Sequence, residues 1–297
     1  MAEAKAKAPV VLDLPELPES LVNYTGEDVR IPRLEVPMIR VSYKSEDDDS
    51  KVCPKGEFIE YNPVTKETKA LGKKVTIQIL HHRQSLSAYK NEESYWTPEI
   101  SMSAKEASLF LGFTKDGKRS NRFLMKGTIS KTGDLRTAYP DLRYQRNLYI
   151  VHEGVLKTLV IYGASFSGFI DLTKELKGAS SSSVLLELST HKEKTGTVIY
   201  YPIAFEIKEK RDPKADEPVL KKLSEWFAKH DSLVAQQLKE RANQASIDRG
   251  DGPIEEVAEV LEKSVPMADQ RTMSEQMKEE KDLEDDEEKV DLKNIPF

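Results

Sequence analysis

The chain has 297 residues, of which 38% are hydrophobic and 32% are charged, and its formal net charge is −6. This length allows one large domain or two small ones, each with a core of its own. The single cysteine, Cys53, excludes an internal disulfide framework, no apolar run approaches transmembrane length, and the N-terminus lacks the apolar core of a signal peptide. We therefore expect a soluble cytoplasmic protein with no membrane partner.

The charge is divided unevenly along the chain. Residues 1–50 carry 6 basic and 11 acidic side chains, residues 51–211 carry 26 and 17, and residues 212–297 carry 13 and 23. The three net charges are therefore −5, +9 and −10. A basic middle between acidic ends suggests a body that binds a polyanion and an acidic end that competes for the same surface.

The first part of the chain is predicted to be mostly β. Residues 1–28 are polar, rich in Ala, Lys, Pro and Glu at their start, and are expected to be a disordered N-terminal segment. Apolar alternation and turn residues after that predict strands, with 147–162 as a hairpin that turns at Glu153-Gly154 and 183–191 paired with 197–208. The other predicted strands are 29–43, 56–61, 75–83 and 122–130. Helices are predicted at 104–111, capped by Ser103, and at 165–176, capped by Ser165.

Strands followed by one short helix and two more strands are the order of the oligonucleotide/oligosaccharide-binding (OB) barrel. We therefore predict an OB-like β-barrel core over residues 29–211, with an unrelated α+β domain as the alternative. A helical extension should follow at 212–264, with helices at 216–230, 232–246 and 254–263. Residues 265–297 should be a disordered acidic tail. The fold class is thus mostly β with α extensions.

Metal and nucleotide chemistry find little support in the sequence. His81 and His82 are neighbours on a predicted strand, so their side chains point to opposite faces and do not chelate one ion together. Cys53 has no Cys-x-x-Cys partner, and there is no Gly-rich phosphate loop. We expect no cofactor, no metal and no enzyme activity, although a scattered metal-dependent nuclease site stays open as an alternative.

A run of cations with interleaved aromatic residues lies between positions 115 and 146. Cations neutralise phosphates while exposed rings stack on bases, so this combination is typical of proteins that hold single strands. Phe123 and Tyr149, on predicted strands, are interpreted as core residues, while Tyr139 and Tyr144 are placed in a loop. The candidate single-stranded DNA-binding residues are Lys115, Lys118, Arg119, Arg122, Lys126, Arg136, Tyr139, Arg143, Tyr144, Arg146 and Trp96.

The last sixteen residues hold seven acidic side chains and end in Ile295, Pro296 and Phe297. This ending resembles that of bacterial single-stranded DNA-binding proteins, whose acidic tail closes with Ile-Pro-Phe and recruits replication and repair enzymes. Lys293 and Asn294 depart from the acidic residues that the family has there. The body looks more like a phage-encoded or otherwise divergent relative. The resemblance implies partner binding by Asp285, Asp286, Asp291, Ile295, Pro296 and Phe297, with an Arg or Lys of the partner on the terminal carboxylate.

The sequence therefore predicts a protein that binds and protects single-stranded DNA without strong sequence preference during replication, recombination or repair. Its tail would recruit partner enzymes, and homo-oligomerisation is left open. A recombination mediator or strand-annealing protein is the first alternative, and a metal-dependent nuclease is the second.

Overall fold

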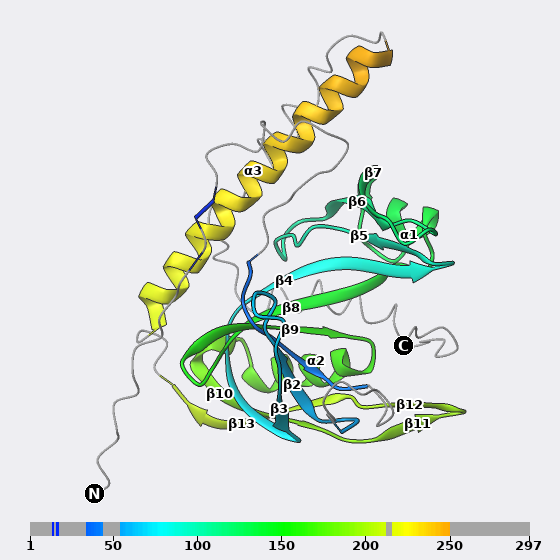
Figure 1. Cartoon of the computed structure of the whole chain (residues 1–297). Helices are drawn as coiled ribbons and strands as arrows, with labels where there is room; N and C mark the ends of the chain where they lie inside the picture. Colours follow the sequence, from blue (N-terminus) through cyan, green and yellow to red (C-terminus); the bar gives the residue numbers. More distant parts are fainter. Residues whose placement is uncertain (1–13, 15, 18–33, 44–53, 212–215, 250–297) are drawn as a thin grey trace, which may run out of the picture.

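The computed structural model describes residues 14, 16, 17, 34–43, 54–211 and 216–249 (Figure 1). Strands dominate this part of the chain, so the predicted mostly-β class with helical additions is confirmed. The acidic tail and its Ile-Pro-Phe ending, the predicted helix at 254–263 and most of residues 1–28 lie outside the described residues.

The main sheet is large and mixed. Neighbouring strands along it are antiparallel, except for the parallel pair β1–β9. Its strands follow the spatial order β3 (Thr68–Gly72), β2 (Phe58–Tyr61), β1 (Met38–Val41), β9 (Val155–Tyr162), β8 (Arg143–His152), β4 (Lys74–Lys90), β5 (Glu93–Trp96), β6 (Glu106–Phe113) and β7 (Arg119–Thr128).

The 17-residue strand β4 connects the two halves of the molecule (Figure 1). Its first residues pair with β10 (Val184–Thr190), its last residues pair with β5, and β8 lies along its other edge from Gln78 to Ser87. β10 also pairs with β13 (Ile203–Lys210). Because β13 has no further partner among the described strands, the sheet does not close into a continuous barrel.

Alternation along β4 defines two faces of the sheet. Ile77, Ile79 and Leu86 belong to the main hydrophobic core on what we call the inner face. The register shifts between Ile79 and His81, as a bulge does, so that His82 opposes the core residue Leu148. The side chains of His81, Arg83, Ser85 and Ser87 point the other way, to the opposite face of the sheet. We call this the outer face.

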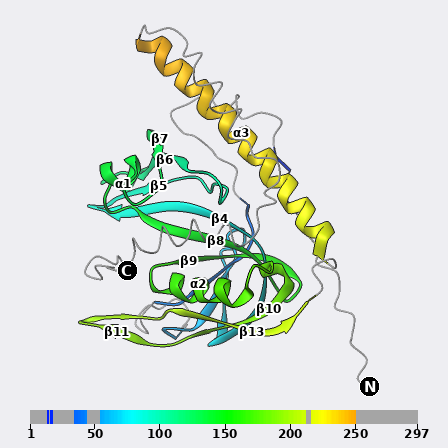
Figure 2. The same cartoon turned by 180° about the vertical axis from the view of Figure 1, so that it is seen from behind.

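Two helices cover the inner face. Helix α2 (Ala164–Leu176) buries Phe166, Phe169 and Ile170, and Figure 2 shows it between β9 and β13. It ends where Lys177 adopts a left-handed conformation, followed by Gly178. Helix α1 (Asp134–Ala138) packs against β7 and buries Leu135, and the short helix η1 (Ser181–Ser183) leads into β10.

Helix α3 (Glu217–Arg249) lies against the outer face of β4 and β8. Leu223, Trp226 and Phe227 form a second apolar cluster with Tyr149 and with Leu17 from the N-terminal segment. The buried Arg83 side chain of β4 donates to Asp231 of α3 at 2.6 Å, and its guanidinium carbon lies 4.5 Å from the ring centre of Phe227. Apolar packing and one ion pair therefore hold α3 against the sheet.

Several strand predictions are confirmed. Residues 75–83 lie in β4, 122–130 largely in β7, and 147–162 in the β8–β9 hairpin with Glu153 and Gly154 at its turn. The helix predicted at 165–176 is α2, but Ser165 is not its cap: Gly163 precedes the helix, and Ser165 Oγ accepts from the backbone N–H of Ile203. The predicted pairing of 183–191 with 197–208 is confirmed only in part: β10 pairs with β13, and the connection between them is longer than predicted because it holds the separate hairpin β11 (Glu193–Thr195) and β12 (Val198–Tyr200).

Two helix predictions are wrong. Residues 104–111 fall mainly in the strand β6, where Ala107 and Leu109 join the inner core while Ser108 and Phe110 face the other way. Pairing with both β5 and β7 satisfies the backbone there, which outweighs a weak helical propensity. The helices predicted at 216–230 and 232–246 are one continuous α3, because Ser232 continues the helix rather than beginning a new one.

Candidate nucleic-acid interface

Register places a row of side chains from five strands on the outer face. Residues directly opposite each other in a ladder share a face. Phe123 of β7 opposes Phe110, which opposes Trp96 of β5. Trp96 opposes Ser87 of β4, and Ser87 opposes Arg143 of β8. A second register line, parallel to the first, runs Tyr89–Ser94–Phe113 over β4, β5 and β6.

The rings of the first row touch one another. Trp96 stacks on Phe110 with ring centres 5.2 Å apart, and Phe123 meets Phe110 edge-on at 5.9 Å. Gly112 leaves room for the indole, because a Cβ there would lie 2.9 Å from Trp96 Cδ1. Phe110 is buried between its neighbours, while 43% of Phe123 stays exposed. The three rings therefore pack against one another as one continuous aromatic surface.

Three further aromatic side chains on this face or at its rim are open to solvent. Tyr89 is 57% exposed, Phe113 is 47% exposed and Tyr162 of β9 is 46% exposed. Exposed apolar side chains that gather on one face mark an interaction site more often than singly scattered ones do. They give a ligand with flat apolar faces several places to stack.

Two guanidinium groups accompany Tyr162. Burial raises the pKa of the Tyr162 phenol, and the positive charges of Arg40 and Arg143 oppose that rise. Arg40 of β1 lies over the ring of Tyr61 at 5.6 Å, which fixes its position on the face. Arg40, Arg143 and Tyr162 thus come from three strands to form one cationic and aromatic cluster.

Of the residues predicted from the sequence, Trp96, Lys126 and Arg143 lie on this outer face. Lys126 opposes Ser108 and pairs with Glu106 at 2.9 Å. Lys115 and Lys118 lie in the turn between β6 and β7, and Lys118 pairs with Asp116. Arg119 of β7 opposes Phe113 in register.

Other predicted binding residues lie on the inner side. Arg122 is exposed but opposes Leu111, whose side chain faces the core side, and Arg136 belongs to α1. Tyr139 packs its ring 5.2 Å from that of Tyr95, on the inner side of the sheet. These three side chains do not join the aromatic row.

The predictions for Tyr144 and Arg146 are wrong, because both lie on β8 and point inward. Tyr144 is 7% exposed and donates its hydroxyl proton to Gln84 Oε1. Arg146 is fully buried, with its guanidinium 5.5–5.6 Å from the ring centres of Tyr144, Phe166 and Phe169. A guanidinium enclosed by aromatic rings has no access to a phosphate, so Arg146 is part of the core.

Phe123 also departs from its prediction, since it was interpreted as a core residue and is exposed. Tyr149 is confirmed in the core: it is 3% exposed and packs on Phe227 at 4.7 Å. Arg40 and Tyr162 were not among the binding residues predicted from the sequence. For Tyr162 the signal was strand parity, because Tyr162 opposes Gln145, two residues after Arg143 on the same face of β8. Arg40 lies on β1, whose place beside β9 depends on a long-range parallel pair.

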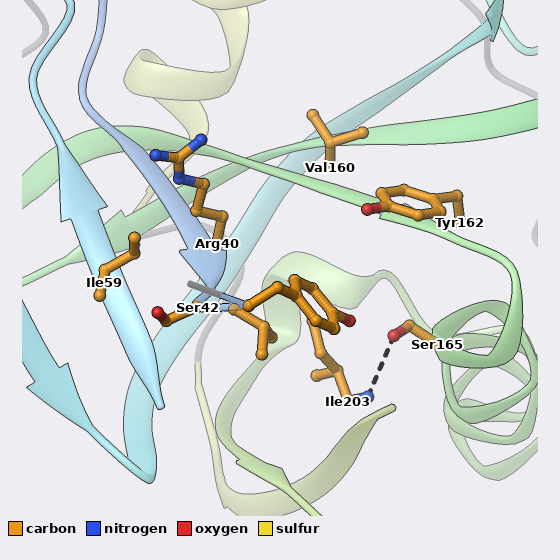
Figure 3. Close-up of a pocket in the computed structure, with 9 residues that line it drawn as sticks. Arg40, Ser42, Ile59, Val160, Tyr162, Ser165 and Ile203 are labelled. Atoms are coloured by element: carbon orange, nitrogen blue, oxygen red, sulfur yellow. Dashed lines mark hydrogen bonds between the residues drawn. The ribbon is translucent and has the colours of Figure 1, made fainter. Parts of the chain in front are cut away.

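A pocket of about 320 Å³ opens beside Tyr162 (Figure 3). Arg40, Ile59, Val160 and Tyr162 contribute from the outer face. Five residues near the end of β1 and the start of α2 complete it: Val41, Ser42, Tyr43, Ser165 and Ile203. The pocket therefore lies at one end of the face that carries the aromatic rows.

The described residues hold no group of three or more His, Cys, Asp or Glu side chains placed to bind a metal ion. Among the same residues, no helix has the length and apolar character needed to cross a membrane. The six predicted partner-binding residues of the tail lie outside the described part of the chain. No protein-family model, no curated protein and no solved structure matches this chain.

Proposed function

We propose that the protein binds single-stranded DNA on the outer face of its sheet, without strong preference for sequence. One observation carries the proposal: exposed rings from β4, β6, β7 and β9 share a face with the guanidinium groups of Arg40 and Arg143. Rings stack on any base, and guanidinium groups bind phosphates, so this combination suits a flexible strand whose bases are unpaired.

Stacking explains why sequence would matter little. Each stacked base contributes about 1–3 kcal/mol, and every base has a flat π-face. A duplex hides these faces inside its own stack, so it offers phosphates, sugars and base edges but no free π-face on which the rings could stack. The aromatic rows therefore favour single strands over duplexes.

The connectivity supports an OB-like interpretation of the core. In chain order, β4, β8 and β9 precede α2, and β10 and β13 follow it. We propose that these five strands correspond to the five OB strands. The outer face of β8 and β9 would then be the ligand face, and the segment with β5, β6 and β7 would be a large insertion between the first two strands.

The acidic segment after residue 281 belongs to the same proposal through its sequence. We propose that it competes with DNA for the basic body and that its Ile-Pro-Phe ending binds replication, recombination or repair enzymes. This part of the proposal rests on residues 282–297 alone.

Fluorescence anisotropy with labelled oligo-dT and a matched duplex tests the proposal. We expect the intact chain to bind oligo-dT at least ten times more tightly than the duplex, and a chain ending at Lys281 to bind oligo-dT more tightly still at low salt. Equal affinities for single strand and duplex would refute the binding proposal. An unchanged affinity after truncation would refute only the competition by the tail.

A further inference from the structure

The pocket beside Tyr162 combines an apolar wall with polar groups at its margin. Ile59, Val160 and Ile203 supply the apolar wall, and Figure 3 shows Val160 and Tyr162 projecting from the same strand. The ring of Tyr43 is 43% exposed, that of Tyr162 46%. Two partly exposed rings and an aliphatic wall suit a flat, aromatic ligand.

Polar groups of two kinds accompany these rings. Arg40 reaches the pocket from β1, where the ring of Tyr61 supports its guanidinium. Ser165 accepts a hydrogen bond from the backbone N–H of Ile203 at 3.1 Å, so its hydroxyl proton remains a donor for a ligand. A phosphate would bind Arg40, and a carbonyl of the base would accept from Ser165.

The size of the pocket limits what it accepts. At about 320 Å³ it lies at the lower end of the range for small-molecule sites, about 300–1,000 Å³. That volume suits one nucleotide unit and not a stretch of stacked bases. Its position beside Arg143 and Tyr162, at one end of the aromatic rows, places it on the course of a bound strand.

We infer that this pocket holds one nucleotide that is turned out of the base stack of its own strand, with its base between the rings of Tyr43 and Tyr162 and its phosphate at Arg40. The inference rests on the proposed function, because it takes the nucleotide to be part of a strand on the outer face. The same chemistry would accept a free mononucleotide. Binding of dTMP and of oligo-dT must therefore be measured separately.

The inference is tested with a substitution that fills the pocket and leaves the aromatic rows unchanged. In Val160→Trp an indole occupies the space that the base would take. Val155→Trp is the matched control, because Val155 lies at the other end of the same strand and is 47% exposed. Thermal unfolding of both variants shows whether each is folded before binding is measured.

We expect Val160→Trp to lower the affinity for oligo-dT about ten-fold, the loss of one stacked base, while Val155→Trp binds like the wild type. In oligo-dT with a single 2-aminopurine, one position should show a fluorescence change that Val160→Trp abolishes. Equal affinities of a folded Val160→Trp and the control would overturn the pocket inference and leave the proposed function standing. A wild type that binds dTMP but no oligo-dT would overturn the proposed function and assign the pocket to free nucleotides.

Discussion

At the scale of single residues, strand parity decides which side chains reach a ligand. Arg143 and Arg146 are three positions apart on β8, so one faces outward and the other lies in the core. The strand predicted from the sequence began at residue 147, which left both arginines in a loop. Had the strand been predicted to begin at Arg143, the alternation of side chains along it would have placed Arg143 and Arg146 on opposite faces of the sheet.

Phe123 tests the stacking role most simply, because it is exposed and lies at the end of the aromatic row. We expect Phe123→Ala to weaken oligo-dT binding by about 1–3 kcal/mol, since one ring is lost. Phe123→Trp keeps a ring at the same place and should retain the wild-type affinity. Anisotropy titrations of both variants measure this, and an alanine variant that binds as tightly as the tryptophan variant would contradict the stacking role.

His81 gives the fold a pH dependence. Burial, with help from the charge of Arg83 and against that of Asp231, lowers the pKa of His81 from 6.5 to about 4. The unfolded chain therefore takes up a proton at higher pH than the folded chain does. Stability that is complete above pH 6.5 should fall by up to about 3 kcal/mol as the pH drops to 4.

Denaturant unfolding at several pH values measures that slope. His81→Gln should flatten the slope in part, because the deeply buried His82 also has a pKa well below its usual value and remains. His191→Gln is the control, since His191 is exposed. The same slope in wild type and His81→Gln would show that His81 does not titrate on unfolding.

At the scale of elements, Phe227 is one of the apolar side chains that hold α3 against the sheet. Its ring lies 5.2 Å from that of His81 and 4.7 Å from that of Tyr149, and it is 4% exposed. We expect Phe227→Ala to lower the free energy of unfolding by about 3–5 kcal/mol, and Phe227→Leu, which keeps most of the apolar volume, by clearly less. Equal stability of the alanine variant and the wild type in urea unfolding would show that α3 is not held by this contact.

The elements that were predicted correctly have a clear pattern of apolar and turn residues in their own sequence. The β8–β9 hairpin has apolar alternation on both strands and the turn at Glu153-Gly154, and α2 buries residues at helical spacing. β6 has no such local signal. Its strand state depends on β5 and β7, which pair with it only in the folded chain, and so short-range pattern alone misassigned it.

The residues of the candidate site also differ in whether the local sequence reveals them. Trp96 and Arg143 could be named from the cation and aromatic pattern in the sequence. Tyr162 could be found from strand parity in the β8–β9 hairpin. Arg40 could not, because β1 joins β9 as a parallel neighbour over a sequence separation of more than a hundred residues. Long-range pairing of this kind leaves no trace in local composition.

At the scale of the whole molecule, the outer face should give binding a defined salt dependence. For single strands, the logarithm of affinity falls with the logarithm of salt concentration by about 0.7 for each phosphate neutralised. Arg40→Ala and Arg143→Ala should therefore each reduce the slope by about 0.7. Lys74→Ala serves as the control, because Lys74 pairs with Glu187 at the far end of β4. Slopes unchanged in both arginine variants would exclude phosphate contacts at these positions.

The central claim is that single strands bind on the outer face around Trp96. Trp226→Phe leaves Trp96 as the only tryptophan, since the chain has two. Titration of this variant with oligo-dT should quench Trp96 fluorescence to saturation at the affinity measured by anisotropy, and the matched duplex should not do so at the same concentrations. A saturating single strand that leaves the Trp96 emission unchanged would contradict the account.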